Sequence, residues 1–98
     1  MKNRNHNLVL LFLLISLNIF AQSPFGVNLA GAEFGSNMPG TFNSDYTYPT
    51  ASELDYYQSK NLNLIRLPFR WERIQPILNG SIDSNELMRL KSFLQLAN

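Results

Sequence analysis

The sequence predicts a parallel α/β fold, and three observations support this prediction. Two short apolar segments, residues 25–31 and 62–67, have the length and the flanking Gly, Asn or Pro that are typical of strands. Each is followed by a segment that opens with a helix-capping signal. The order strand, helix, strand, helix is the start of a parallel sheet whose crossovers are helices.

The first predicted strand runs from Phe25 to Gly31, an apolar run that is too short for a helix. Residues 32–49 follow it, and their glycines, prolines and asparagines interrupt any periodic pattern, which predicts a long loop. Loops of this length in compact domains are usually functional or mobile. The loop is therefore one candidate location for a site.

A helix is predicted to begin at Ala51, because Thr50 and Glu53 match a capping box. In such a box the threonine hydroxyl accepts the Glu53 amide proton, and the glutamate carboxylate reaches back to the threonine amide. The helix should end near Lys60, where Asn61 can take the left-handed backbone conformation that closes a helix. Its inward residues are expected to be Leu54 and Tyr57.

The second predicted strand covers residues 62–67 and stops at Pro68, because proline cannot donate a hydrogen bond to a sheet ladder. Strand alternation puts Leu62, Leu64 and Arg66 on one face of the sheet. An arginine on an otherwise apolar face needs an explanation.

The rest of the chain is predicted to form a loop and a second helix. The loop covers residues 69–82 and contains the turn pair Asn79-Gly80. Asp83 and Glu86 resemble a second capping box, so a helix should follow. Its inward stripe is expected to be Leu87, Leu90, Leu94 and Ala97. Because two parallel strands leave sheet edges and faces uncovered, we expect the chain to be the opening part of a larger domain.

Residues 1–21 have the three-part plan of a secretory signal peptide. Lys2 and Arg4 precede the apolar residues 8–20, and Ala21 supplies a small residue before the expected cut. The apolar stretch is shorter than the roughly 20 residues of a membrane-spanning helix. We therefore expect a secreted protein that does not remain in the membrane after the leader is removed.

Composition excludes several kinds of site. Cysteine is absent, which excludes disulfides, and the single histidine, His6, lies in the leader, which excludes a His/Cys metal site. We expect no metal and no other cofactor. The net charge is +1, and without the leader six basic side chains face seven acidic ones, so no basic surface indicates binding to nucleic acid.

Arg66 is the most informative candidate, because it stands at the carboxyl end of a predicted parallel strand, where α/β folds place their ligand sites. A buried guanidinium needs a partner, since an unpaired buried charge is strongly destabilising. One interpretation is a structural ion pair with Glu33 or Glu72. The other is that Arg66 orients a catalytic carboxylate and keeps it ionised.

Two glutamates follow the two strands, Glu33 after the first and Glu72 after the second. Parallel strands end at one edge of a sheet, so the two carboxylates have the arrangement of an acid/base pair. The alternative is that Glu33 fixes its loop through hydrogen bonds and that Glu72 forms a salt bridge with Arg70 or Arg73. Spacing alone does not decide between them.

Three aromatic residues lie in the same predicted loops: Tyr46, Tyr48 and Trp71. Their rings have the shape to stack on the flat face of a sugar. They are equally suited to cover the ends of the strands.

Three segments together resemble the start of a secreted glycoside hydrolase family 5 cellulase. They are Gly26-Val-Asn-Leu-Ala-Gly-Ala-Glu-Phe-Gly35, Tyr48-Pro49 and Ile65-Arg-Leu-Pro-Phe-Arg-Trp-Glu-Arg-Ile-Gln-Pro76. The resemblance extends from Phe25 to the end of the chain. It implies a (β/α)8 barrel of which residues 22–98 form the amino-terminal part, with the first two βα units. It also implies internal cleavage of β-1,4-glucan with retention of configuration, no cofactor, and a monomer when complete.

By this resemblance Arg66 matches the arginine at the end of the second barrel strand, which contacts the nucleophilic glutamate. Glu33 falls near the glucan cleft, and Tyr48 and Trp71 are the further candidates for substrate binding. The two catalytic glutamates of the family come from the fourth and seventh strands, which are not in this sequence. We therefore expect activity from the complete protein and none from this fragment alone.

Two other functions are compatible with the sequence. One is a family 5 hydrolase that acts on mannan, xylan or mixed-linkage glucan. The other is a small secreted carbohydrate-binding module, which would need a self-contained sheet and a row of exposed aromatic residues.

Overall fold

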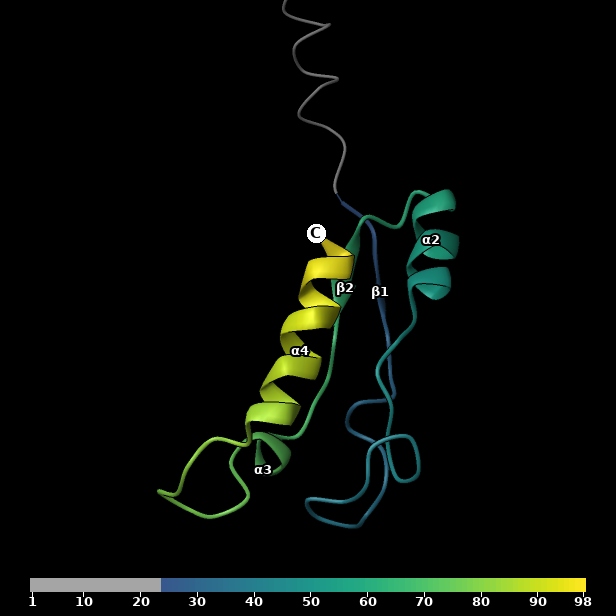
Figure 1. Cartoon of the computed structure of the whole chain (residues 1–98). Helices are drawn as coiled ribbons and strands as arrows, with labels where there is room; N and C mark the ends of the chain where they lie inside the picture. The colour runs from purple at the N-terminus through teal and green to yellow at the C-terminus, as the bar shows by residue number, and fades with distance from the viewer. Residues whose placement is uncertain (1–23) are drawn as a thin grey trace, which may run out of the picture.

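The computed structural model describes residues 24–98, so the predicted signal peptide lies outside the described residues. Two parallel strands and three helices make up the described chain, with one helix between the strands and two after the second strand (Figure 1). In order they are β1 (Gly26–Asn28), α2 (Ala51–Ser59), β2 (Leu64–Arg66), α3 (Trp71–Ile74) and α4 (Ser84–Ala97). The predicted order of strand, helix, strand and helix is confirmed.

The two strands pair in parallel, with Gly26 opposite Leu64 and Asn28 opposite Arg66. The regular strands are three residues long, shorter than predicted. Each strand has one hydrogen-bonding neighbour among residues 24–98, so the ladder covers only the stretch that the pair shares. Helix α2 forms the crossover between the strands, as a parallel connection requires.

Helix α2 begins where its capping box predicts. The Glu53 amide donates to the Thr50 hydroxyl at 3.3 Å, and the Thr50 amide donates to Glu53 Oε2 at 2.6 Å. Asn61 follows the helix with a φ of 62°, the left-handed conformation that was predicted for it. Leu54 is the buried residue of this helix.

Helix α4 has the predicted position but a different inward face. The Asp83 carboxylate accepts from the Glu86 amide at 2.8 Å, which is half of the predicted capping box. Phe93 is 3% exposed whereas Leu94 is 55% exposed, so the predicted stripe is wrong by about one residue. Phe93 lies two helical turns after Glu86, so both side chains occupy one face. The buried Glu86 thus shares the helix face that packs on the rest of the chain.

Residues 69–82, which were predicted as one loop, contain the short helix α3. Arg73 and Ile74 in this turn are both 2% exposed, and the Asp83 amide donates to the Ile74 carbonyl at 2.7 Å. A single helical turn has a high nucleation cost and depends on tertiary contacts. No periodic sequence pattern could have indicated it.

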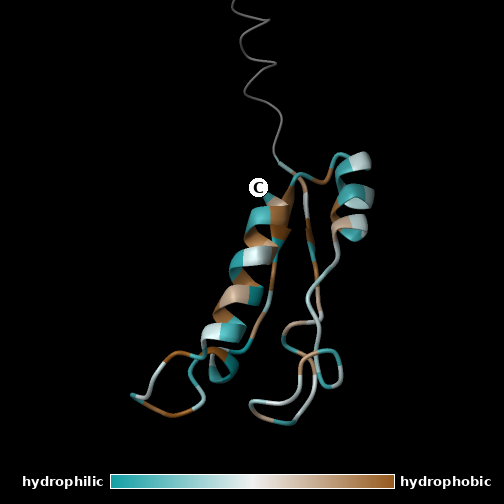
Figure 2. Cartoon of the chain, viewed as in Figure 1, coloured by the Kyte–Doolittle hydropathy of each residue, from teal (hydrophilic) through white to brown (hydrophobic). Residues whose placement is uncertain are grey.

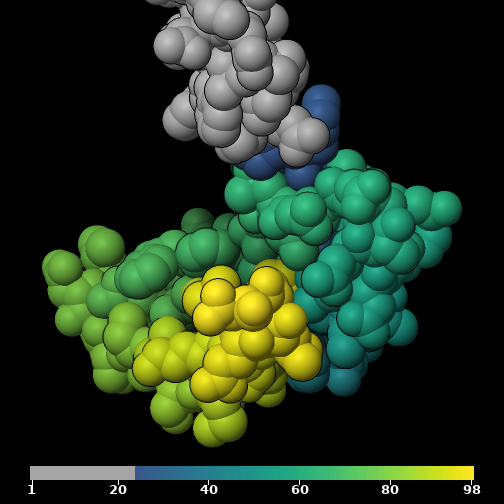
Figure 3. All heavy atoms as spheres, turned by 90° about the horizontal axis from the view of Figure 1, so that it is seen from above, coloured from purple at the N-terminus to yellow at the C-terminus, as the bar shows by residue number. Residues whose placement is uncertain are grey.

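The core lies on one face of the strand pair, under α2 and α4. It is built around Leu29, Leu54 and Phe93. The view from above shows α4 and α2 side by side (Figure 3), and the apolar side of α4 is brown in Figure 2. On the strands, the core receives Val27 and Ile65, while Leu64 is 56% exposed on the opposite face. That opposite face, where Arg66 also lies, has no covering layer among residues 24–98.

No helix in residues 24–98 is both long enough and apolar enough to cross a membrane.

Candidate active site

The candidate site lies at the carboxyl ends of the two strands. Because the strands are parallel, the segments that follow them emerge at the same end of the molecule (Figure 1). These are the β1–α2 loop, residues 29–50, and the β2–α4 segment, residues 67–83. All sequence-predicted site residues belong to these segments or to the last residue of β2.

Arg66 is the last residue of β2, and its Nη1 donates to Oδ1 of Asn28, its partner in the register. The interpretation as a structural ion pair with Glu33 or Glu72 is wrong, because the one salt bridge among residues 24–98 joins two other side chains. Arg66 is exposed on the uncovered face, beside a hollow of about 420 Å³ lined by both strands. Only one guanidinium hydrogen bond is made within the described chain, so the planar fork remains available to an acceptor across this face.

Glu33 fixes its own loop. Its Oε2 accepts from the Gly31 amide at 2.9 Å, and its backbone carbonyl accepts from Arg70 Nε at 2.7 Å. Gly31 has a φ of 143°, and a Cβ there would lie 2.8 Å from the Thr47 carbonyl, so this close turn requires glycine. The loop-fixing alternative for Glu33 is therefore confirmed.

Glu72 is exposed and forms no salt bridge with Arg70 or Arg73, so the predicted surface pair is wrong. Both arginines instead donate to backbone carbonyls of the β1–α2 loop. No hydrogen bond joins Glu72 to Glu33 among the described residues. Glu33 is instead engaged with its own loop, so an acid/base role for these two carboxylates stays a prediction.

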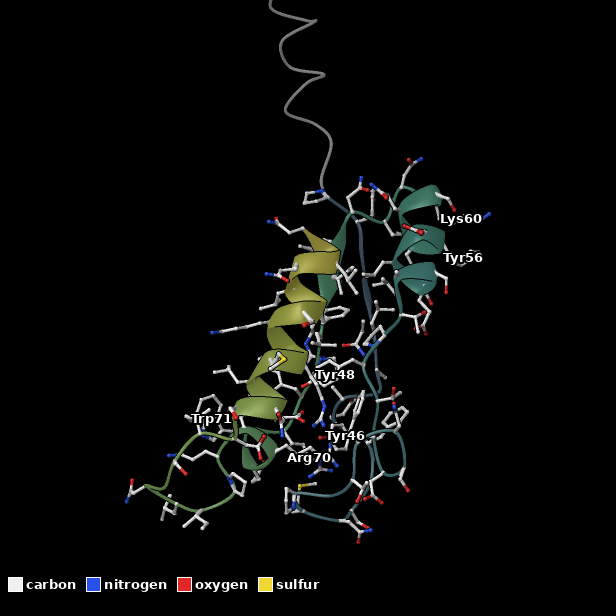
Figure 4. The ribbon with its side chains drawn as sticks, viewed as in Figure 1. Tyr46, Tyr48, Tyr56, Lys60, Arg70 and Trp71 are labelled. Atoms are coloured by element: carbon white, nitrogen blue, oxygen red, sulfur yellow. The ribbon has the colours of Figure 1, made fainter. Side chains whose placement is uncertain are left out.

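Trp71 begins α3 and is 55% exposed. Its indole Nε1 donates to Gln75 Oε1 at 2.9 Å, which orients the ring. Figure 4 shows Trp71 near Arg70 at the strand-end side of the molecule. An exposed and oriented indole offers a flat apolar face, so its role in substrate binding stays a prediction.

Tyr48 belongs to the β1–α2 loop, and its side chain points toward α4 (Figure 4). Its hydroxyl donates to Glu86 Oε1 at 2.8 Å, and its ring centroid lies 6.4 Å from that of Phe93. Burial, followed by the Glu86 hydrogen bond, raises the pKa of Tyr48 well above its usual range. This placement favours the alternative in which the aromatic residues cover the strand ends, and contact of Tyr48 with substrate stays a prediction.

Tyr46 occupies the same layer. Its hydroxyl donates to Glu86 Oε2, and burial together with this hydrogen bond raises the pKa of Tyr46 to about 12. Glu86 also accepts from Arg89 Nη1 at 2.9 Å. The carboxylate is thus surrounded by hydroxyl and guanidinium donors.

Sequence reasoning missed the burial of Arg73 and Glu86. They are 2% and 3% exposed, and together they are the buried charged side chains of the described part of the chain. The sequence indicated a surface salt bridge for the first and a capping role for the second. The one available signal concerned Glu86: the β1–α2 loop contains two tyrosines, Tyr46 and Tyr48, whose hydroxyls need partners when they are buried.

The sequence of this chain is similar to sequences of known proteins. The model of the cellulase family, glycosyl hydrolase family 5, matches residues 23–98. Endo-beta-1,4-glucanase B of Emericella nidulans is 44% identical over 69 residues, which cover 69% of this chain and 21% of that protein. The chain spans about a fifth of the length of the curated relatives it matches.

Solved structures of cellulases are also similar to this chain. XacCel5A in complex with cellopentaose has a TM-score of 0.72 and 53% identity, over 76% of this chain and 24% of that chain. Endoglucanase Cel5A of Pseudomonas stutzeri in complex with cellobiose has a TM-score of 0.73 and 37% identity, over 76% of this chain and 23% of that chain.

The fold class is therefore the (β/α)8 barrel, of which this chain supplies the first two βα units. The chain belongs to the cellulases of glycosyl hydrolase family 5.

Proposed function

We propose that the full-length protein is a secreted glycoside hydrolase that cleaves β-1,4-glucan internally with retention of configuration. The observation that carries this proposal is the position of Arg66. It ends a parallel strand, is held by Asn28, and presents its guanidinium on the face that a complete barrel encloses. The family match supports the same reaction class.

The chemistry requires two carboxyl groups about 5–5.5 Å apart, one acting as nucleophile and the other as acid and then base. In this proposal both come from barrel strands outside this chain. Arg66 is the positioning residue for the nucleophile, because its planar fork can hold a carboxylate through two parallel hydrogen bonds. Its positive charge also lowers the pKa of that carboxyl and keeps it ionised.

The proposed substrate is a β-1,4-glucan. The relatives bound to cellopentaose and cellobiose support this choice. Trp71 is the proposed stacking platform, because its indole is exposed at the strand ends and is oriented by Gln75. Glu33 is proposed to line the same cleft through its anchored loop.

Substrate comparison tests the proposal. The full-length protein is assayed on soluble cellulose, mannan, xylan and mixed-linkage glucan, with the anomeric form of the first product followed by nuclear magnetic resonance. We expect internal cleavage of cellulose and a product that first appears as the β-anomer. A preference for mannan or xylan would reject β-1,4-glucan as the substrate, and an α-anomer as the first product would reject the retaining mechanism.

Secretion is the remaining part of the proposal, and the charged start and apolar run of residues 1–21 support it. Mass spectrometry of the exported protein should find Gln22, or its cyclised form, at the amino terminus. A membrane-bound product that retains Met1 would contradict removal of the leader.

A further inference from the structure

The two buried charged side chains of residues 24–98 both come from the second βα unit, and both bind the loop of the first. Arg73 belongs to α3 and Glu86 to α4. Burial of a charged group is costly unless its hydrogen bonds are made. Neither residue has a part in the reaction proposed above, so their burial needs another reason.

Arg73 holds the first half of the β1–α2 loop. Its Nε donates to the Pro39 carbonyl at 2.9 Å, its Nη1 donates to the Ala32 carbonyl at 2.6 Å, and its Nη2 donates to the Phe34 carbonyl. The guanidinium is planar and rigid, so these bonds fix the three carbonyls relative to one another. A lysine could not hold all three in this geometry.

Glu86 holds the second half of the same loop. Its two carboxylate oxygens accept from the hydroxyls of Tyr46 and Tyr48. The Tyr46 ring also joins the two anchors, because the Arg73 guanidinium carbon lies 3.9 Å from the ring centroid. The anchors therefore form one connected unit between the loop and the second βα unit.

The loop held in this way reaches the strand ends. It carries Glu33, whose carbonyl is bound by Arg70, and Phe34, which is 53% exposed. We propose that Arg73 and Glu86 are positioning residues that hold the β1–α2 loop as a preformed wall of the glucan site. This proposal rests on the function proposed above. A wall that is already ordered binds substrate without the entropic cost of ordering it, so loss of either anchor should weaken substrate binding more than turnover.

The test compares Arg73→Lys and Glu86→Gln with Glu53→Gln in the full-length protein. Arg73→Lys keeps the charge and removes the fork. Glu86→Gln keeps the shape of the side chain, but its amide nitrogen cannot accept a tyrosine proton. Glu53→Gln is a matched control, because Glu53 also follows its helix N-cap by three residues but caps α2 at an exposed position.

Two readouts are compared: the steady-state constants for cellopentaose, and amide hydrogen exchange of residues 29–49, which leaves out the Thr50 amide that Glu53 binds. For both test variants we expect KM to rise about tenfold with kcat within about twofold, which is the effect of losing about one ordered side chain from the binding surface. Exchange in the loop should become faster, while exchange in α2 stays at the wild-type rate. Glu53→Gln should leave KM and loop exchange unchanged.

An unchanged KM with unchanged loop exchange would overturn the proposal, as would a fall in kcat at constant KM. If Arg73→Lys fails to fold, the near-isosteric Glu86→Gln decides the question by the same readouts. If the wild-type protein cleaves no β-glucan, the proposed function fails. In that case hydrogen exchange of the β1–α2 loop still tests whether Arg73 and Glu86 anchor the loop. Faster exchange in the two variants supports anchoring, and exchange at the wild-type rate rejects it.

Discussion

Arg66 donates a hydrogen bond from Nη1 to Oδ1 of Asn28, the residue directly beside it in the parallel strand pair. The register places both side chains on the same face, because partners in a ladder point the same way. Both stand at the carboxyl ends of their strands. The amide of Asn28 therefore holds the guanidinium in place without neutralising it, which leaves the positive charge available to a carboxylate.

Replacement of Arg66 in the full-length protein should lower turnover. Arg66→Lys keeps the charge but loses the fork, and Arg66→Ala loses both. We expect kcat to fall by a factor of about 10² or more, with alanine worse, because misplacing a catalytic group by about 1 Å costs that much. Circular dichroism and thermal unfolding of the same samples provide the folding control. A correctly folded Arg66→Ala with near wild-type kcat would make Arg66 a structural residue only.

Asn28→Ala should lower kcat by less than Arg66→Ala, on the order of tenfold, because it frees the guanidinium from one hydrogen bond and leaves the fork present. The double variant should be no slower than Arg66→Ala alone, since Asn28 is expected to act only through Arg66. Asn63→Ala, which changes an exposed asparagine just before β2, is the matched control. Additive losses in the double variant would show that Asn28 acts independently.

Residues 22–98 alone should neither fold cooperatively nor hydrolyse cellulose. Leu64 on the uncovered sheet face and Ile77 and Leu78 in the β2–α4 segment are 56%, 72% and 89% exposed. A pair of strands with one uncovered face does not reach independent stability. Thermal unfolding and a reducing-sugar assay of the purified fragment test this. A sharp unfolding transition together with released sugar would contradict the prediction.

Stability of the full-length protein should fall at high pH through the tyrosines on Glu86. Burial and the Glu86 hydrogen bond raise the pKa of Tyr46 from about 10 to about 12. A raised pKa in the folded state means that the stabilisation is fully present below about pH 10 and is lost as the pH rises toward 12. The free energy of unfolding should therefore fall less steeply between pH 10 and 12 in Tyr46→Phe than in wild type. Tyr56→Phe, which changes an exposed tyrosine on α2, is the matched control. Equal slopes in wild type and Tyr46→Phe would show that the Tyr46 hydroxyl is not linked to folding.

The sequence alone was enough to predict helix ends that are fixed by neighbouring residues. The start of α2 was predicted correctly from the capping box of Thr50 and Glu53, and its end from the left-handed Asn61. Both signals depend on residues within a few positions of one another. The same holds for the start of α4, where the Asp83 carboxylate caps the helix. Arg66 stood out because an arginine breaks the apolar pattern of its strand face.

Tertiary structure decided the features that depend on distant partners. Helix α3 exists because Arg73 and Ile74 pack against other segments, and the inward face of α4 follows from the burial of Phe93 and Glu86. The partner of Arg66 proved to be Asn28, 38 positions away, rather than a glutamate. Glu86 accepts a hydrogen bond from Tyr46, 40 positions away, because a buried carboxylate needs donors and the fold brings tyrosine hydroxyls within reach. Sequence alone determined where the chain turns and caps itself, whereas burial determined which charged side chains hold the strand-end loop.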